Sequence, residues 1–224
     1  MAENFVVYLV DDDPGVLKAL SRLLRVKGYD VKPYVSPRLF LDEHDAETPG
    51  CAILDVSMPG LDGLELQRAL TPSTGFHRPV LFITGNGDVP TSVCAMKAGA
   101  VDFLTKPVKE EALFDAISRA QDRDVQSRRA YSELESIRRK IRTLTPRERE
   151  VLMHVVAGRM NKQIAGDLGT VEKTIKVHRS RVMEKLGVHT IADLVRMIEK
   201  LNVTKQGSLP IGPRANSTDL LRDK

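Results

Sequence analysis

The 224-residue sequence lacks tryptophan, contains only two cysteines, and has aromatic residues at just 4% of its positions. Two cysteines are too few for a disulfide framework or a cysteine-based metal site, so we expect a reduced, cytoplasmic setting. The scarcity of aromatic rings argues against nucleic-acid binding by base stacking on a wall of aromatics. Cys51 is expected in a buried strand and Cys94 in a packed helix face, neither with a redox role.

Long hydrophobic runs are absent as well. No stretch approaches the ~20 apolar residues that a membrane-spanning helix needs. The N-terminus runs into Asp11, Asp12 and Asp13 instead of a basic and apolar signal segment. We therefore expect no membrane partner. With 42% apolar and 29% charged residues, the composition is typical of a globular protein with one large domain or two small ones.

Charge is divided unevenly along the chain, although the formal net charge of the whole is only +4. Residues 1–120 carry 12 basic and 17 acidic side chains, a net charge of −5. Residues 121–224 carry 22 basic and 13 acidic side chains, a net charge of +9. This division indicates two modules, one suited to cations and one to a polyanion. A further hypothesis is that the acidic module masks the basic one until it is modified.

The first half alternates short apolar runs, rich in β-branched residues, with helix-like stretches. The predicted strands are residues 5–10, 31–35, 51–56, 80–83 and 101–104. The predicted helices are residues 14–27, 37–43, 64–70 and 89–98, with a fifth beginning near residue 109. Runs that barely alternate in polarity are typical of strands buried on both faces. We therefore predict an α/β doubly wound parallel sheet of five strands in the order 2-1-3-4-5.

A stretch without glycine or proline separates Pro107 from Pro146. It predicts a helix over residues 109–142, and we assign residues 121–142 as a helical linker. An apolar stripe with heptad spacing lies near its end, formed by Leu134, Ile137, Ile141 and Leu144. The stripe is too short to establish a coiled coil. A solvated connector and a dimerising or signal-transmitting helix both remain open.

A small all-α domain of four helices is predicted over residues 143–204. Thr145, Pro146 and Glu148 combine a capping box with the favoured proline position, which indicates a strong helix start. This helix ends near Gly158. The predicted helices that follow are residues 161–168, 172–186 and 191–201. Residues 205–224, which hold glycine, proline, serine and asparagine, are predicted to form a mobile tail.

Polar side chains follow the ends of several predicted strands. Asp11 and Asp12 follow the first strand, and Asp55 lies near the end of the third. Ligands of doubly wound sheets bind beyond the carboxyl ends of the strands, so we expect these carboxylates to converge and to require a cation such as Mg²⁺ or Mn²⁺. Thr84 ends the fourth strand, and Lys106 follows the fifth. They are suited to hold phosphoryl oxygens while a carboxylate acts as the nucleophile.

Residues 1–120 resemble the receiver domain of two-component response regulators. The matching strings are VDDD at 10–13, LDVSMPG at 54–60, ITG at 83–85 and FLTKP at 103–107. The resemblance implies a flavodoxin-like fold in which Asp55 accepts a phosphoryl group from a sensor histidine kinase. It also implies that Mg²⁺ is bound by Asp11, Asp12, Asp55 and the Ser57 carbonyl. Thr84 and Lys106 would contact the phosphoryl oxygens, and Thr84 and Phe103 would form the switch pair. The Lys106–Pro107 peptide bond would be cis.

The basic charge of the second half gathers on residues 172–186, which follow a short helix and a glycine turn. A basic helix with one apolar stripe in that position fits a major-groove recognition helix and a solvated surface helix equally well. The opposite net charges of the two halves favour the recognition helix. The strings LTPREREVL at 144–152, NKQIA at 161–165, TIKVH at 174–178 and KLGV at 185–188 resemble the LuxR-type helix-turn-helix. The resemblance implies that Lys176 and Val177 face base edges. Candidates for phosphate or base contacts are Lys162, Lys173, Thr174 and Arg179. Thr170 is expected to cap the recognition helix.

A receiver followed by this module is the architecture of the NarL/FixJ family of response regulators. The resemblance implies a transcription regulator that binds double-stranded promoter DNA as a homodimer once Asp55 is phosphorylated, with RNA polymerase as a further candidate partner. We expect no enzyme activity beyond phosphorylation and dephosphorylation of Asp55 itself. Two alternatives remain: a regulator that binds DNA without phosphorylation and uses the receiver as a dimer scaffold, and a phosphoryl sink.

Overall fold

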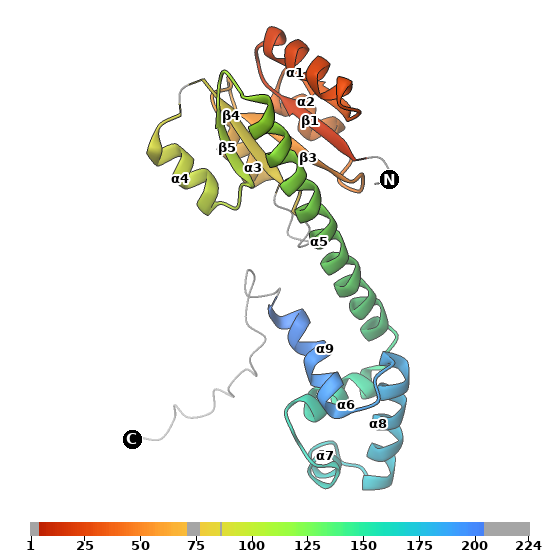
Figure 1. Ribbon diagram of the computed structural model, residues 1–224. Helices are drawn as coiled ribbons and strands as arrows, with labels where there is room; N and C mark the ends of the chain where they lie inside the picture. The colour runs from red at the N-terminus through yellow and green to blue at the C-terminus, as the bar shows by residue number, and fades with distance from the viewer. Residues whose placement is uncertain (1–4, 71–76, 86, 204–224) are drawn as a thin grey trace, which may run out of the picture. The chain divides into compact units, whose positions relative to one another are not determined.

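The computed structural model describes residues 5–70, 77–85 and 87–203 (Figure 1). The tail predicted for residues 205–224 lies outside the described residues. The chain divides into two compact units, one ending at Ser132 and the other beginning at Glu133. Each unit is described by itself. None of the helices within the described residues is both long and apolar enough to span a membrane.

The first unit is built on a parallel sheet of five strands in the order β2-β1-β3-β4-β5. The strands are β1 (Val6–Val10), β2 (Asp30–Tyr34), β3 (Gly50–Asp55), β4 (Val80–Thr84) and β5 (Asp102–Thr105). Every residue of β1, β3 and β4 is buried, as expected of strands covered on both faces. The predicted fold class and strand order are confirmed, and each strand begins and ends within one residue of its predicted bounds.

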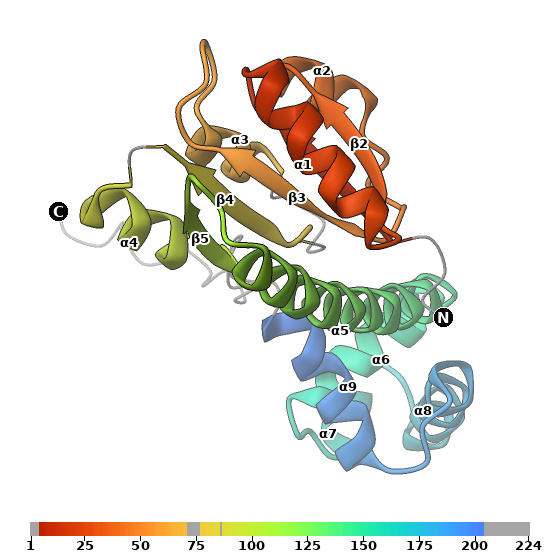
Figure 2. The same ribbon diagram turned by 45° about the horizontal axis from the view of Figure 1, so that its top comes forward.

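Five helices cover the two faces of this sheet (Figure 2). They are α1 (Pro14–Val26), α2 (Pro37–Glu43), α3 (Gly63–Ala69), α4 (Val89–Lys97) and α5 (Glu110–Arg142). Leu24 of α1 and Ile117 of α5 pack on one face. Phe40 of α2, Leu66 of α3 and Ala95 of α4 pack on the other. This covering leaves the carboxyl ends of the strands as the edge at which polar side chains gather.

Short polar side chains begin these helices where the sequence places them. Asp13 caps α1 by accepting hydrogen bonds from the backbone nitrogens of Gly15 at 2.7 Å and Val16 at 3.4 Å. Asp62 forms a capping box with Glu65 at the start of α3. Such caps satisfy backbone N–H groups that have no partner within the helix. Asp13 is therefore a structural residue, in contrast to Asp11 two positions earlier.

Helix α5 extends over 33 residues without interruption. Its apolar contacts with the sheet end at Ala120, and Val125 beyond that point is 47% exposed. The heptad spacing of the apolar stripe allows a contact with a second helix in a dimer, but the last two residues of the stripe have a different role. Ile141 and Leu144 pack into the core of the second unit, so these two positions are not available to a partner helix.

The second unit contains α6 (Pro146–Val156), α7 (Asn161–Asp167), α8 (Glu172–Leu186) and α9 (Ile191–Val203). Its core joins Val151, Ile164, Ile175, Val182 and Leu194, among others. The capping box of Thr145 and Glu148 is present at the start of α6, as predicted. Gly169 holds the turn between α7 and α8 at a φ of +61°, a conformation that favours glycine.

Two local expectations are wrong. Val171 occupies the N-cap position of α8, and its side chain makes no capping hydrogen bond, whereas Thr170 lies one residue outside. Cys94 is exposed, because α4 turns the neighbouring Ala95 toward the core. Cys51 is fully buried in β3 as expected, and loss of solvation raises its pKa to about 12. A thiol with so high a pKa is a poor redox sensor.

Candidate functional site

Lys106 links two carboxylates at the carboxyl ends of the strands. Its Nζ lies 2.7 Å from Oδ2 of Asp11, which follows β1, and 2.9 Å from Oδ1 of Asp55, which ends β3. Both carboxylate side chains are nearly buried, with 7% and 6% of their surface exposed, while 25% of the lysine side chain is exposed. Two acidic groups that are almost withdrawn from water thus contact the same cation.

Backbone nitrogen atoms hold the remaining oxygens of the two carboxylates. Oδ2 of Asp55 accepts a hydrogen bond from the backbone nitrogen of Ser57 at 2.8 Å. Oδ1 of Asp11 accepts one from the backbone nitrogen of Asp13 at 2.9 Å. Each carboxylate is therefore fixed at both oxygens, and one edge of Asp55 faces the ammonium. This arrangement presents an oriented carboxylate at the edge of the sheet.

Burial and charge act in opposite directions on Lys106. Loss of solvation disfavours its ammonium, but hydrogen bonds to Asp11 and Asp55 and the charges of both outweigh that cost. The net effect raises the pKa of Lys106 above its usual value. The lysine is therefore charged at any physiological pH. A permanent cation beside a carboxylate is suited to offset the charge of an incoming phosphoryl group.

The predicted metal residues are brought only partly together. Asp11 and Asp55 meet at Lys106, Ser57 is exposed next to them, and Asp12 is exposed at the rim. In the described part of the chain, no three His, Cys, Asp or Glu side chains form a group that could hold a metal ion. The donor chemistry nevertheless fits Mg²⁺, because the neighbouring carboxylate oxygens and the Ser57 carbonyl are hard ligands.

The remaining predicted site residues lie on β4 and β5. Thr84 is buried at the end of β4, and its carbonyl accepts a hydrogen bond from the backbone nitrogen of Lys106 at 2.7 Å. The peptide bond from Lys106 to Pro107 is cis, as predicted. Phe103 on β5 is partly buried, with its ring centroid 6.1 Å from that of Phe82. The proposed switch residues therefore lie on two strands that pair with each other.

Gly87 is a residue of this region that sequence reasoning missed. A Cβ atom at this position would lie 3.1 Å from the Phe103 ring, 3.1 Å from Cγ2 of Thr105 and 3.3 Å from Cγ2 of Thr84. A side chain would therefore crowd both switch residues. The sequence offered only a weak signal, namely a glycine shortly after the threonine that ends the fourth strand.

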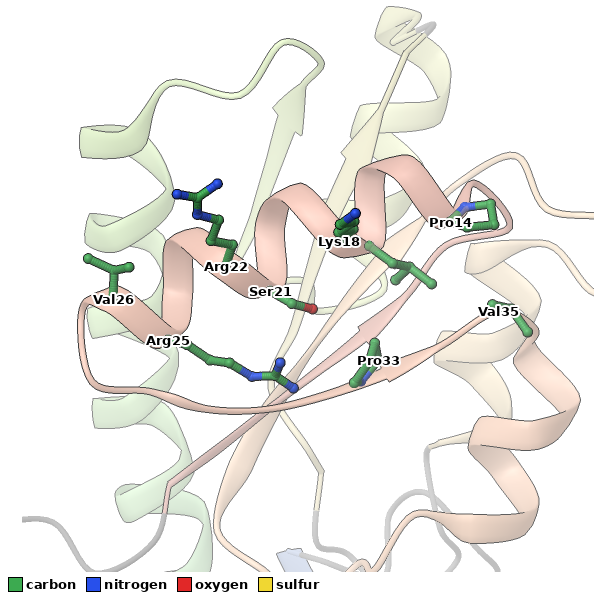
Figure 3. A pocket seen from close by; sticks show the side chains of 9 residues that line it. Pro14, Lys18, Ser21, Arg22, Arg25, Val26, Pro33 and Val35 are labelled. Atoms are coloured by element: carbon green, nitrogen blue, oxygen red, sulfur yellow. The ribbon is translucent and has the colours of Figure 1, made fainter.

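A groove of the first unit lies away from this chemistry, between α1 and β2 (Figure 3). Its volume is about 690 Å³. Its lining combines Pro14, Leu17, Lys18, Ser21, Arg22, Arg25, Val26, Pro33 and Val35. Neither Asp55 nor Lys106 belongs to it. This groove is therefore separate from the candidate site, which is marked by charge and burial instead.

Helix α8 presents the second candidate site. Ile175, Val182 and Leu186 are buried on one side of the helix, and Lys173, Lys176 and Val177 are exposed on the other. Lys176 contacts Glu172 one turn earlier at 3.4 Å, yet 64% of its side chain remains exposed. Thr174 is half-buried, and Lys162 is exposed on α7. The predicted base-facing residues thus share a solvent-accessible face.

Two arginines change the predicted set of contacts on this face. Arg179 donates a hydrogen bond from Nη1 to Oδ1 of Asn161 at 2.9 Å, so it ties α8 to α7 in addition to any external contact. Arg181 was not among the predicted contact residues, but it is exposed one helical turn after Val177. The helical spacing from 177 to 181 was the signal that could have identified it.

Comparisons with known proteins identify a domain in each half of the chain. Residues 7–118 match the response regulator receiver domain. Residues 142–198 match the luxR family of bacterial regulatory proteins. Together these matches define a two-component response regulator with a receiver domain and a LuxR-type DNA-binding domain.

Curated relatives are similar to this chain over most of both lengths. Nodulation protein W of Bradyrhizobium diazoefficiens is 41% identical over 89% of this chain and 87% of its own length. Response regulator protein TodT of Pseudomonas putida is 44% identical over 88% and 86% of the two lengths. Transcriptional regulatory protein FixJ of Rhizobium meliloti is 40% identical over 87% and 95%. The chain belongs to the NarL/FixJ family of response regulators.

Solved structures support the same assignment. The response regulator StyR has a TM-score of 0.70 and 43% sequence identity, with 88% of this chain and 99% of that chain covered. Full-length FixJ from B. japonicum has a TM-score of 0.52 and 35% identity, with 89% and 98% covered. FixJ is named as a transcriptional regulatory protein, and receiver domains generally bind Mg²⁺ at the acidic pocket.

Proposed function

We propose that Asp55 is the phosphoacceptor of this regulator. The observation that carries the proposal is the contact of Asp11 and Asp55 with the single ammonium of Lys106 at a nearly buried edge of the sheet. A carboxylate oxygen of Asp55 attacks the phosphorus of a phosphohistidine on the sensor kinase. A P–O bond forms, the P–N bond breaks, and the imidazole leaves and takes up a proton.

The neighbouring groups have distinct tasks in this transfer. Lys106 and Thr84 contact the phosphoryl oxygens. The ammonium of Lys106, which contacts the two carboxylates before the transfer, then neutralises part of the added phosphoryl charge. Asp11, Asp12, Asp55 and the Ser57 carbonyl hold Mg²⁺ or Mn²⁺. The bound ion supplies further neutralisation of phosphate charge. Hydrolysis of the acyl phosphate at Asp55 is the only other chemistry that we assign to the chain.

The phosphoryl group then changes the output of the regulator. It adds about −1.5 to −2 charges at pH 7, which attract Thr84 toward Asp55 and allow Phe103 to turn inward. Such a local change shifts the equilibrium between two conformations of the receiver surface. We propose that the modified surface promotes homodimerisation, which places two copies of α8 on a promoter in double-stranded DNA. RNA polymerase is a candidate partner there, and the setting is cytoplasmic.

The nucleic-acid contacts follow from the exposed face of α8. Lys176 and Val177 face base edges in the major groove, while Lys162, Lys173, Thr174 and Arg179 contact phosphates or bases. We add Arg181 as a phosphate contact because it is exposed on the same face. The domain limits that we propose are 1–120 for the receiver, 121–142 for the linker and 143–204 for the DNA-binding domain.

Replacement of Asp55 by asparagine tests the proposal. Asp13→Asn is a matched control, because asparagine retains the capping function of Asp13 at the start of α1. Each protein is incubated with acetyl phosphate and Mg²⁺, then analysed by intact mass and by binding to a promoter fragment selected with the phosphorylated wild type. We expect only Asp55→Asn to lose both the phosphoryl mass shift and the donor-dependent gain in DNA affinity.

The same experiment separates the alternatives. If Asp55→Asn dimerises and binds DNA in response to the donor, the phosphoacceptor assignment is wrong. If the wild type binds the fragment equally well with and without the donor, the receiver serves as a scaffold. If phosphorylation is followed only by rapid hydrolysis with no DNA binding at all, the chain is a phosphoryl sink.

A further inference from the structure

Arg128 of α5 binds a short loop of the first unit. The guanidinium donates from Nη1 to the carbonyl of Glu47 at 2.7 Å. It donates from Nη2 to the carbonyls of Thr48 at 2.8 Å and Ala46 at 3.3 Å. These contacts join positions about 80 residues apart in the sequence. We call residues 45–48, which connect α2 to β3, the carbonyl loop.

The carbonyl loop has a prepared shape. The carboxylate of Asp45 accepts hydrogen bonds from Oγ1 of Thr48 at 2.6 Å and from the backbone nitrogen of Glu47 at 2.9 Å. Both bonds favour the charged carboxylate, so they lower the pKa of Asp45. The loop is therefore closed by its own side chains, and its backbone carbonyls are free to accept bonds from outside it.

A second, buried arginine binds the same loop from the sheet. Nη2 of Arg78 donates to the carbonyl of Asp45 at 2.6 Å and to that of Thr48 at 3.2 Å. The guanidinium lies 4.5 Å from the ring centroid of Tyr8 on β1, and only 6% of the residue is exposed. Four consecutive carbonyls thus face two guanidinium groups. Bonds to charged donors are roughly twice as strong as neutral ones.

Asp124 orients Arg128 from within the same helix. Its Oδ2 lies 2.9 Å from Nε of Arg128, and the aspartate is 1% exposed. Apolar contacts between α5 and the sheet end at Ala120. The segment that follows, residues 121–132, makes polar contacts with loops of the first unit. Besides those of Arg128, these include one from Arg123, whose Nη1 donates to the carbonyl of Ala100 at 3.3 Å.

The carbonyl loop lies at the opposite ends of the strands that carry the phosphoacceptor site. Tyr8 is on β1, which leads to Asp11, and the loop continues into β3, which ends at Asp55. Arg78 lies two residues before the start of β4, which ends at Thr84. A rearrangement of these strands therefore has a direct mechanical route to α5 through the two arginines.

We infer that Arg128 is a positioning residue that fixes residues 121–132 of α5 to the receiver. Because this segment is held in place, a phosphorylation-dependent change in the receiver is transmitted through α5 to the DNA-binding unit. The inference rests on the proposed function for its signal. It makes the first half of the predicted linker a working part of the receiver. The fork geometry of arginine is essential, because lysine cannot bind three carbonyls and a carboxylate in one plane.

The test compares Arg128→Ala and Arg128→Lys with Arg129→Ala in the full-length chain. Arg129 is the adjacent residue and is exposed, so its replacement matches the change in helix composition and charge. Three quantities are measured: Asp55 phosphorylation by acetyl phosphate, amide hydrogen exchange along α5, and affinity for the selected promoter fragment with and without the phosphodonor.

We expect both Arg128 variants to be phosphorylated like the wild type. Amides of residues 121–132 should exchange at least ~10-fold faster, since their local opening becomes easier, while residues 110–120 keep their protection. The donor-dependent gain in DNA affinity should fall by ~5-fold or more, the lower range of allosteric coupling. Arg129→Ala should behave as the wild type in all three measurements.

Two results overturn the inference. Unchanged exchange in residues 121–132 refutes the anchor itself. Faster exchange with an undiminished donor-dependent gain shows that Arg128 only stabilises the receiver and positions nothing. If the wild type and Arg129→Ala also lack a donor-dependent gain, the proposed function has failed, and with it the delivery role of Arg128. The exchange measurement then decides separately whether the anchor exists.

Discussion

The two candidate sites of this protein are assembled in different ways. The candidate receiver site combines Asp55 and Thr84, which end β3 and β4, with Asp11 and Lys106, which directly follow β1 and β5, so its geometry depends on the sheet as a whole. The DNA-binding face of α8 is drawn from a single helix, and its side chains are neighbours because of helical periodicity. Substitutions in the receiver site should therefore act on a shared arrangement, whereas those on α8 should act one contact at a time.

The largest effect is expected from Lys106→Met, which removes the cation between the two carboxylates. Loss of one preorganised group that stabilises developing charge typically costs ~10²–10³ in rate. We expect phosphorylation of Asp55 by acetyl phosphate to slow by at least ~100-fold. Basal DNA affinity should remain unchanged, because α8 belongs to the other unit. Stopped-flow or mass-based kinetics and a binding titration measure the two quantities.

Lys109→Met is the matched control for that prediction, since Lys109 is exposed and lies three residues beyond the site. It should retain wild-type kinetics. Comparable phosphorylation rates in Lys106→Met and Lys109→Met would show that the ammonium merely fills space between Asp11 and Asp55. The contrast between a cooperative receiver site and an additive DNA interface would then be lost.

The next effect concerns single contacts on α8. Lys176→Ala should weaken binding to the selected promoter fragment by ~10-fold or more, with little change for random DNA, because base contacts carry sequence information. Arg181→Ala should weaken binding to both DNAs similarly and reduce the salt dependence by about one phosphate contact. Titrations at several salt concentrations measure both effects. Equal losses on both DNAs for Lys176→Ala would place that residue on the backbone instead.

Gly63→Ala tests how strictly the receiver site depends on packing. A Cβ atom at Gly63 would lie 2.3 Å from the carbonyl oxygen of Asp55 and 3.1 Å from the Phe82 ring. Overpacking of this kind typically costs ~1–3 kcal/mol. We expect a free energy of unfolding of the first unit lower by that amount and slower phosphorylation of Asp55. Urea denaturation, monitored through the NMR resonances of β3, measures the free energy of unfolding.

Gly166→Ala in α7 is the opposite case and serves as the control. No atom lies within 4 Å of a Cβ at this position, and its φ is not positive. Alanine favours helix by up to ~1 kcal/mol over glycine. The second unit should therefore become slightly more stable. A loss of stability from Gly166→Ala, or none from Gly63→Ala, would contradict the packing that distinguishes these two glycines.

Much of this architecture could be predicted because its signals are local. Runs rich in β-branched residues identified β1, β3 and β4, and capping residues such as Thr145 identified helix starts. The contact of Lys106 with Asp11 and Asp55 was predictable only as a shared edge, since distances depend on side-chain packing. Cys94 was misplaced because helical spacing alone does not state which face of a short helix turns inward.

Other features had no sequence signal of their own. The role of Arg128 depends on a loop 80 residues away that presents several carbonyls at once. The lack of a side-chain cap at Val171 reflects a helix start that packing and the turn at Gly169 fix instead. Long-range polar contacts to the backbone therefore marked the limit of prediction, since any residue can supply a carbonyl.

The smallest effect is expected from Glu148→Gln, which sharpens the comparison within the second unit. Glu148 accepts a hydrogen bond from Nζ of Lys185 at 2.6 Å and closes the capping box with Thr145. These bonds, with that to Lys185 the strongest, lower the pKa of Glu148 to about 2. Glutamine preserves the capping box but removes the charge. The variant should be less stable at pH 7 by about 1 kcal/mol.

The pH dependence gives this prediction its sign. Because the folded pKa of Glu148 lies below its unfolded value of 4.5, its ionic contribution is complete above pH 4.5 and is lost as the pH falls toward 2. Wild type and Glu148→Gln should therefore differ in urea midpoint for the α8 resonances at pH 7 and converge near pH 2. Glu150→Gln is the control, because Glu150 is half exposed and pairs with Arg147 on the surface. A difference that persists at pH 2 would assign the effect to altered capping instead of to the ion pair with Lys185.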